Sequence, residues 1–172
     1  DKIFNELNLD KNKKVIGINP YVLWETRRWN EKNYIEIIKR FNKQYNFVLL
    51  VGNDSIEINS IIESELQEQN IKIANLTSKF NLKESIYFMK KLDLVLTADC
   101  GPMHFALLMK VPTLALFGPV NPEHRLPIDY KNKKFFGSLW FLDYKPGKKY
   151  NYESEHIEKE MVGLKAIPVD DV

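Results

Sequence analysis

The chain has a single cysteine, Cys100, among its 172 residues, so no disulfide framework can form within it. One free thiol is compatible with a reducing compartment. Nothing in the sequence approaches the roughly 18 consecutive apolar residues of a membrane span, and residues 1–5 lack the basic-then-apolar pattern of a secretion signal. We therefore expect a soluble, cytoplasmic protein.

The sequence also lacks a block of like charges. Its 25 Lys and Arg residues nearly balance 23 Asp and Glu residues, which gives a net charge of +2 that is spread along the chain. Such a balance provides no strong field to attract duplex nucleic acid or an anionic membrane. We therefore expect no nucleic-acid partner. His104, His124 and His156 show no zinc-like spacing with one another or with Cys100, so we expect no metal site either.

Short apolar segments rich in branched side chains alternate with amphipathic stretches along most of the chain. The apolar segments predict strands at 14–19, 47–51, 71–74, 93–97 and 113–117. The amphipathic stretches predict helices at 31–45, 54–69 and 82–89. The alternation predicts an α/β fold, a Rossmann-like parallel sheet with helices on both faces, in which ligands bind beyond the carboxyl ends of the strands.

A chain of this length fits one domain of ordinary size. We assign residues 1–13, which are polar and weakly apolar, to a linker and residues 14–172 to the domain. The periodicity fades beyond Asn121, so a long loop region with a short helix is expected there. Residues 168–172 have the proline and acidic residues of a helix start, and we expect the chain to be a fragment of a longer protein.

The most informative stretch is 94–108, in which an apolar strand runs through the Asp-Cys-Gly sequence at 99–101 into a short helix. The first backbone N–H groups of a helix have no partner within the helix and bind anions. Pro102 suits the first turn because its missing N–H costs nothing there. His104 would be neutral near the positive end of the helix dipole and would donate one N–H to a ligand oxygen; its alternative role is structural.

Two side chains of the same turn have other expected roles. Asp99 would repel a phosphate, so it either accepts hydrogen bonds from sugar hydroxyls or caps the turn before the helix. Cys100 has no neighbouring base in the sequence, and we interpret it as a small side chain rather than a nucleophile.

Arg27, Arg28 and Trp29 follow the first predicted strand, directly before a helix. A guanidinium is always charged and binds phosphate oxygens with a fork of N–H donors, so Arg27 is a candidate contact for a diphosphate. The sequence leaves equally open that Arg27 touches no ligand. We expect Arg28 to be solvated and Trp29 to pack under the helix.

Three further candidates follow the second and third predicted strands. Gly52 ends a strand where the backbone comes close to another group. Glu57 would hold two ribose hydroxyls, or it would simply complement the dipole of the helix it begins. Phe80 would either stack on a nucleobase or pack in the core.

Four segments together resemble one enzyme family, the ADP-heptose:lipopolysaccharide heptosyltransferases of glycosyltransferase family 9. They are residues 27–29, Gly52 with Glu57, residues 92–104 and residues 111–119. Members of that family have two Rossmann-like domains that face each other across a cleft, an arrangement called GT-B. This chain, from about residue 15 to residue 122, resembles the C-terminal, donor-binding half without the N-terminal acceptor domain.

The resemblance implies a nucleotide-sugar site formed by Arg27, Glu57, Phe80, Asp99, Cys100, Gly101 and His104. Arg27 would contact the donor phosphate, Glu57 the ribose and Phe80 the base. Asp99 would contact the sugar, and the other three residues would line the diphosphate and the sugar. Cys100 stands where the family usually has serine or threonine, so the backbone N–H is kept while a hydroxyl contact is weakened.

The reaction implied by the resemblance is transfer, with inversion, of a heptose-type sugar to lipopolysaccharide or a related surface glycan. The donor would be ADP-heptose or another nucleotide diphosphate sugar, and no cofactor would be required. The catalytic base and the glycolipid acceptor would belong to the missing domain, and the full enzyme would associate peripherally with the inner face of the cytoplasmic membrane. Two other functions stay open, namely half of a GT-B-like nucleotide-sugar epimerase and a non-catalytic nucleotide-sugar-binding module.

Overall fold

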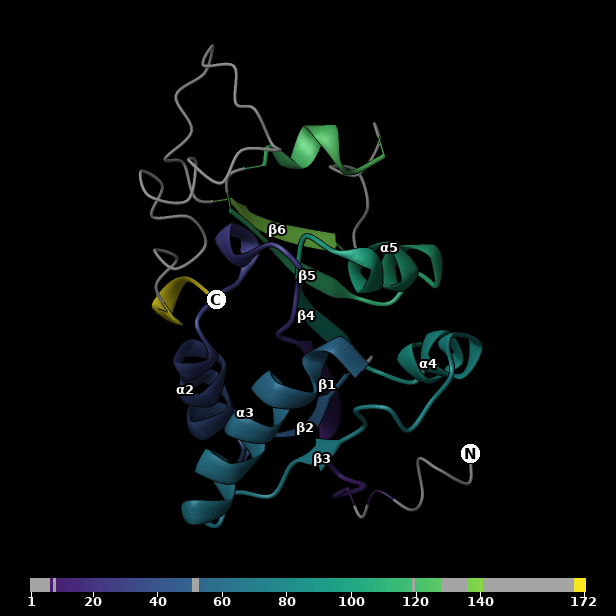
Figure 1. Cartoon of the computed structure of the whole chain (residues 1–172). Helices are drawn as coiled ribbons and strands as arrows, with labels where there is room; N and C mark the ends of the chain where they lie inside the picture. Colours follow the sequence, from purple (N-terminus) through teal and green to yellow (C-terminus); the bar gives the residue numbers. More distant parts are fainter. Residues whose placement is uncertain (1–6, 8, 51–52, 119, 128–135, 141–168) are drawn as a thin grey trace.

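A six-stranded parallel sheet forms the centre of the protein, with strand order β3-β2-β1-β4-β5-β6 (Figure 1). The computed structural model describes residues 7, 9–50, 53–118, 120–127, 136–140 and 169–172. The strands are β1 (Lys14–Asn19), β2 (Tyr45–Leu49), β3 (Ala74–Asn75), β4 (Leu94–Ala98), β5 (Thr113–Phe117) and β6 (Phe136–Trp140).

Helices cover both faces of this sheet. The helices of the described residues are α2 (Glu31–Phe41), α3 (Ile56–Glu68), α4 (Leu82–Met89) and α5 (Gly101–Leu108), with short 3-10 turns η1 (Glu25–Arg27), η2 (Asn53–Ser55), η3 (Pro122–His124) and η7 (Val169–Asp171). Helices α2 and α3 lie on one face, and α4 and α5 lie on the other (Figure 1). The predicted α/β fold with a Rossmann-like parallel sheet is confirmed. No helix of the described residues has both the length and the apolar character needed to cross a membrane.

The strands are apolar on both faces because both faces are covered. Successive side chains of a strand point to opposite sides of the sheet. In β2, Phe47 and Leu49 join the cluster under α2 and α3, whereas Val48 joins the cluster under α4 and α5. This double burial explains why the sequence shows continuous apolar runs instead of alternation.

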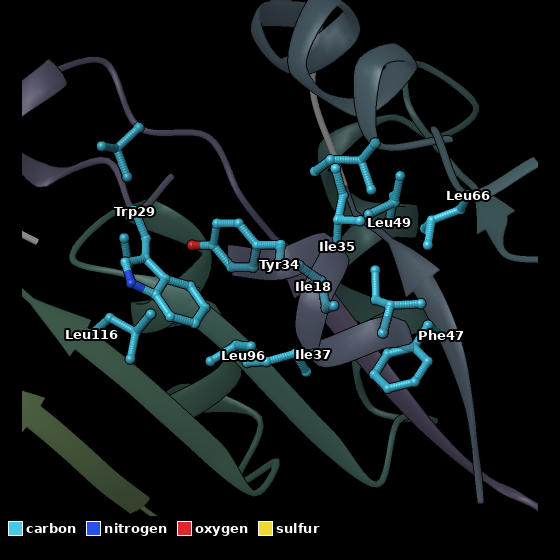
Figure 2. Close-up of a cluster of buried hydrophobic side chains, with 14 residues drawn as sticks. Ile18, Trp29, Tyr34, Ile35, Ile37, Phe47, Leu49, Leu66, Leu96 and Leu116 are labelled. Carbon is cyan, nitrogen blue, oxygen red and sulfur yellow. The ribbon is translucent and has the colours of Figure 1, made fainter. Parts of the chain in front are cut away.

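An aromatic pair anchors the core between α2 and the sheet (Figure 2). Trp29 and Tyr34 are both fully buried, with ring centroids 4.9 Å apart and ring planes at 85°. Edge-to-face aromatic contacts of this kind add stability beyond the area they bury. Trp29 comes shortly before the start of α2, so its burial also fixes the end of the loop that follows β1. The expected packing of Trp29 under the helix is confirmed.

Several predicted boundaries shift; β2, for example, covers Tyr45–Leu49 instead of 47–51. Helix α2 ends at Phe41 instead of residue 45, because the chain turns after Asn42 and Tyr45 already opens β2. Strand β3 keeps only Ala74–Asn75 near the end of the predicted 71–74 segment, since it pairs with β2 through two residues at the edge of the sheet.

The prediction of a long loop with a short helix beyond Asn121 was wrong for residues 136–140. They form β6, which pairs in parallel with β5 from Thr113↔Phe136 to Phe117↔Trp140. Gly137 and Ser138 interrupt the apolar run, and glycine does not favour a strand, so pairing with β5 decides the conformation. At the other end of this region, η7 forms a single 3-10 turn where a helix start was expected. Residues 128–135 and 141–168 lie outside the described residues.

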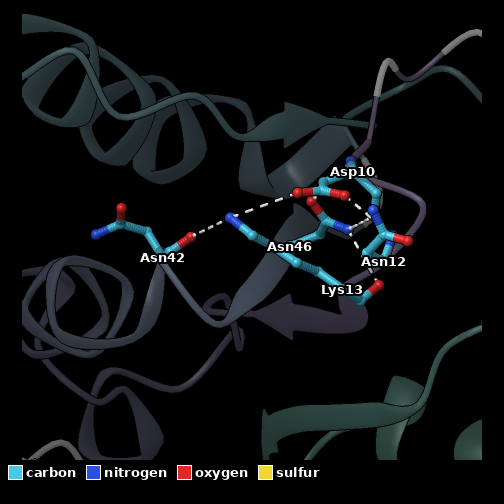
Figure 3. A network of polar contacts seen from close by, with 5 residues as sticks. All are labelled: Asp10, Asn12, Lys13, Asn42 and Asn46. Atoms are coloured by element: carbon cyan, nitrogen blue, oxygen red, sulfur yellow. Dashed lines mark hydrogen bonds and ion pairs between the residues drawn. The ribbon is translucent and has the colours of Figure 1, made fainter.

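The segment before β1 is attached to the start of β2 by polar contacts (Figure 3). The Asp10 N–H donates to Asn46 Oδ1 at 3.1 Å, and Asn46 Nδ2 donates to the Asp10 carbonyl at 2.8 Å. Lys13 Nζ donates to the Asn42 carbonyl at 3.1 Å. Residues 10–13, which belong to the predicted linker, are therefore held against the domain.

Candidate functional site

The strand order places a candidate site between β1 and β4. Strands β2 and β3 extend the sheet on one side of β1, and β5 and β6 extend it beyond β4. In parallel α/β sheets, ligands bind outside the carboxyl ends of the strands at such a reversal. The loop after β1 carries Arg27 in η1, and the loop after β4 leads through Asp99 into α5. These two loops flank the switch point between β1 and β4.

A buried carboxylate joins three of the loops at this edge. Asp99 is 4% exposed, and its Oδ2 lies 3.3 Å from Arg27 Nη1 and 3.7 Å from Nε of Arg125, which follows η3 in the loop after β5. No described donor makes a hydrogen bond of good geometry to this oxygen, so both contacts are ion pairs without a direct hydrogen bond. A buried carboxylate without nearby cations is strongly disfavoured. The two guanidinium groups therefore stabilise Asp99 in its buried position.

Asp99 does not take its alternative expected role as a cap for α5. The N-cap position belongs to Cys100, and its side chain makes no capping hydrogen bond. Arg27 is held on two sides, because its guanidinium carbon also lies 5.9 Å from the ring centroid of Trp24. The side chain of Arg27 is only 15% exposed. The structure thus brings Arg27 and Asp99 together at the start of α5.

The thiol of Cys100 is tied to the ends of β1 and β4. Asn19 Nδ2 donates to Cys100 Sγ at 3.1 Å, Thr97 Oγ1 lies 3.3 Å from the same sulfur, and the thiol donates to the Ala98 carbonyl at 3.2 Å. Burial raises the pKa of the Cys100 thiol. A thiol that stays protonated is a poor nucleophile, which agrees with the interpretation of Cys100 as a small side chain.

Gly101 and His104 lie in the first turn of α5, and both are exposed. An added Cβ at Gly101 would meet only Phe105 Cε2, at 4.0 Å, so packing within the described residues does not demand a glycine there. The open space allows a ligand to approach the N-terminal N–H groups of the helix. Because Asp99 directly precedes this turn, Arg27 and His104 belong to the same edge of the sheet.

Arg28 was expected to be solvated, but its side chain contacts its own loop instead. Its Nε donates to the Val22 carbonyl at 2.7 Å, its Nη2 donates to the Leu23 carbonyl at 3.3 Å, and its guanidinium carbon lies 4.7 Å from the ring centroid of Tyr21. These contacts fold the loop after β1 around the Arg28 side chain. Arg28 therefore supports the loop that presents Arg27.

Glu57 is exposed and lies in the first turn of α3. Together with Tyr21, Arg28 and Asp54 it lines a hollow of about 400 Å³. This position places Glu57 beside the loop after β1, although Arg27 itself does not line the hollow. Gly52 lies outside the described residues.

Phe80 is half-buried and packs against Phe88 of α4, with ring centroids 5.4 Å apart and ring planes at 32°. It belongs to the cluster under α4 and α5, on the opposite face from Trp29. The contact with Phe88 favours the packing interpretation of Phe80 over stacking on a base.

Sequence reasoning missed three polar residues at this edge. Asn19 and Thr97 are buried near the ends of β1 and β4, where a polar residue closing an apolar run could have marked them. Arg125 had no comparable signal, because it stands in a loop without periodicity. Only the fold brings its guanidinium to Asp99.

The fold and the site define a class of protein: a Rossmann-like domain whose helix N-terminus and guanidinium groups at a switch point suit an anionic nucleotide. The sequence comparisons specify the family. The model of glycosyltransferase family 9 (heptosyltransferase) matches residues 2–150. The chain belongs to this family, as the resemblance implied.

One relative agrees with this assignment, and two solved structures agree with the fold. Lipooligosaccharide heptosyltransferase 2 of Campylobacter jejuni is 32% identical over 135 residues, which cover 77% of this chain and 42% of the relative. The glycosyltransferase family 9 structure from Veillonella parvula superimposes with a TM-score of 0.76 at 23% identity, over 99% of this chain and 47% of the other. Escherichia coli ADP-heptose lipopolysaccharide heptosyltransferase II gives a TM-score of 0.75 at 22% identity, over 96% and 46%. The chain thus spans less than half the length of these relatives.

Proposed function

We propose that this chain is the donor-binding half of a glycosyltransferase that transfers a heptose-type sugar, with inversion, from a nucleotide diphosphate sugar to lipopolysaccharide or a related surface glycan. The observation that carries the proposal is the meeting of Arg27, Asp99 and the start of α5 at the switch point of a family 9 chain. ADP-heptose is the donor named for the related Escherichia coli enzyme, and it is the donor proposed here.

The contribution of this half to the reaction is electrostatic. When the bond between the sugar and the diphosphate breaks, negative charge grows on the departing phosphate oxygens. Donors that are already oriented toward such oxygens lower the barrier. In this proposal Arg27, the N-terminal N–H groups of α5 and a neutral His104 supply those donors. The base that deprotonates the acceptor hydroxyl belongs to the other half of the enzyme.

The remaining residues would recognise the sugars of the donor. Glu57, exposed beside the loop after β1, would accept hydrogen bonds from the ribose hydroxyls. Asp99 would face the transferred sugar, and its ion pair with Arg27 would hold the Asp99 side chain in place. Gly101 leaves room for the diphosphate at the helix start, and Cys100 supplies a backbone N–H there.

The proposal requires no metal ion, because fixed cations and helix N–H groups neutralise the diphosphate. It also places the enzyme in the cytoplasm, at the inner face of the cytoplasmic membrane, with the glycolipid acceptor bound by the other half. A transfer assay in the presence of a chelator tests the first point, and we expect the activity to survive. Cell fractionation tests the second point. Activity that chelation abolishes and added Mg²⁺ restores would contradict the first.

A thermal-shift panel of ADP, GDP, UDP and their sugars tests the proposal directly. A ligand at 100 times its dissociation constant stabilises the folded state by about 2.7 kcal/mol. For a chain of this size that raises the melting temperature by roughly 5 to 10 °C. We expect ADP and ADP-heptose to give such shifts.

Two variants sharpen the experiment. His104→Ala removes an exposed side chain, so it should reduce the ADP shift without lowering the melting temperature of the free protein. Arg40 lies in the last turn of α2, at the end away from the loop that carries Arg27. Arg40→Ala should therefore change neither the ADP shift nor the nucleotide preference. Absence of any shift with all the nucleoside diphosphates would overturn the proposed function.

A further inference from the structure

Arg125 is the second cation on the Asp99 carboxylate, and the family resemblance assigned it no role. Its Nε lies 3.7 Å from Asp99 Oδ2, while Arg27 approaches the same oxygen at 3.3 Å. The three residues come from loops that follow β5, β4 and β1, which are neighbours in the sheet. Asp99 therefore sits over the middle strand, with one guanidinium from each adjacent strand.

The charges of this cluster do not cancel. One carboxylate between two guanidinium groups leaves a net charge of +1. Arg27 is 15% exposed and forms the shorter of the two ion pairs, whereas the side chain of Arg125 is 42% exposed. Within the described part of the chain, Arg125 has Asp99 as its side-chain partner through Nε, so both terminal NH2 groups remain for a further acceptor.

A diphosphate at this edge needs more positive charge than the other groups supply. Arg27 and Asp99 together are close to neutral, and a helix N-terminus contributes only about half a unit charge. Arg125 adds one full positive charge to the cluster around Asp99. Its position over β5 places it on the side of Asp99 away from Arg27.

We propose that Arg125 is a donor-binding residue whose terminal NH2 groups contact the diphosphate of the nucleotide sugar. Asp99 acts as its positioning residue, because its carboxylate attracts the guanidinium from the Nε side, at 3.7 Å, and leaves both terminal NH2 groups for the ligand. This inference rests on the proposed function and adds a specific residue to it. A guanidinium suits the role since its planar fork can donate two parallel hydrogen bonds to phosphate oxygens.

Calorimetric titration of the full-length protein with ADP and with adenosine tests the assignment. Arg125→Gln should weaken ADP binding about tenfold, the effect of losing one charge-assisted contact, and should leave adenosine binding unchanged. Arg125→Lys should lose about threefold, because the charge remains while the fork is lost. Arg40→Gln is the matched control: its side chain is also 42% exposed, it is part of α2, and both titrations should equal those of the wild type.

The outcomes separate this inference from the proposed function. If the wild type binds none of ADP, GDP and UDP, both fall. If the wild type binds ADP and Arg125→Gln binds it equally well, the proposed function stands and the role of Arg125 is overturned. A parallel loss of ADP and adenosine binding in folded Arg125→Gln would assign Arg125 to structural support of Asp99, and it would overturn the inference too. If Arg125→Gln does not fold, the same comparison is made with Arg125→Lys.

Discussion

The ion pair between Arg27 and Asp99 should be a measurable source of stability as well as part of the site. Replacing Arg27 with methionine keeps most of the apolar stem and removes the charge. At 3.3 Å and an effective dielectric constant of about 20, the attraction between the two charges is about 5 kcal/mol. The cost of removing both groups from water offsets part of this attraction. Arg125 still faces Asp99 in the variant, at 3.7 Å.

We therefore expect Arg27→Met to lower the free energy of unfolding by about 2 to 3 kcal/mol, below the range for breaking an isolated buried pair. Urea denaturation of the wild type, Arg27→Met, Asp99→Asn and the double variant gives the coupling energy of the pair. The double variant should lose about 2 kcal/mol less than the sum of the single variants. A coupling energy below about 0.5 kcal/mol would show that the ion pair contributes little and that Asp99 is stabilised by other means.

Three further predictions concern the scaffold around the site. Gly17→Ala should cost about 1 to 3 kcal/mol in urea denaturation, since an added Cβ would lie 2.8 Å from Leu50 Cδ1 and would also overlap Leu92; an unchanged midpoint would contradict the tight packing of β1. Tyr34→Phe should leave the unfolding free energy within about 0.5 kcal/mol of the wild type or raise it, because the buried hydroxyl has no partner among the described residues. A loss above 1 kcal/mol would refute this reasoning. Burial raises the pKa of Cys100, so the unfolded thiol ionises first as the pH rises. The stability of the wild type relative to Cys100→Ser should be constant below about pH 8 and should then fall by up to about 1.4 kcal/mol per pH unit; a difference that stays flat from pH 7 to pH 10 would contradict it.

The sequence was sufficient for the order of elements in the first two thirds of the chain. Strands β1 and β5 have their predicted bounds, and the bounds of β4 shift by one residue. Each of these segments can be recognised as a strand from a few residues, because it is an apolar run that ends at a turn. Strand β6 lacks such a run, and its conformation depends on pairing with β5, which is distant in sequence.

Some residues of the candidate site could likewise be recognised from the local sequence, whereas others depend on tertiary contacts. The turn at 99–101 could be recognised from sequence, because the start of a helix depends on neighbouring residues and its N–H groups are unpaired wherever it lies. Arg28 and Phe80 could not be assigned in this way. Arg28 contacts two backbone carbonyls and the Tyr21 ring of its own loop. Phe80 packs on Phe88. Both sets of contacts depend on the path of the backbone.

By itself, then, the sequence determined the α/β fold, the family and the position of the turn that begins α5, since all three depend on short-range patterns. Only the tertiary structure decided that Arg27, Asp99 and Arg125 share one cluster of charges. The physical reason is that a salt bridge depends on distances of a few ångströms between side chains. Those distances are set only after the parallel sheet has brought the loops of β1, β4 and β5 to one edge.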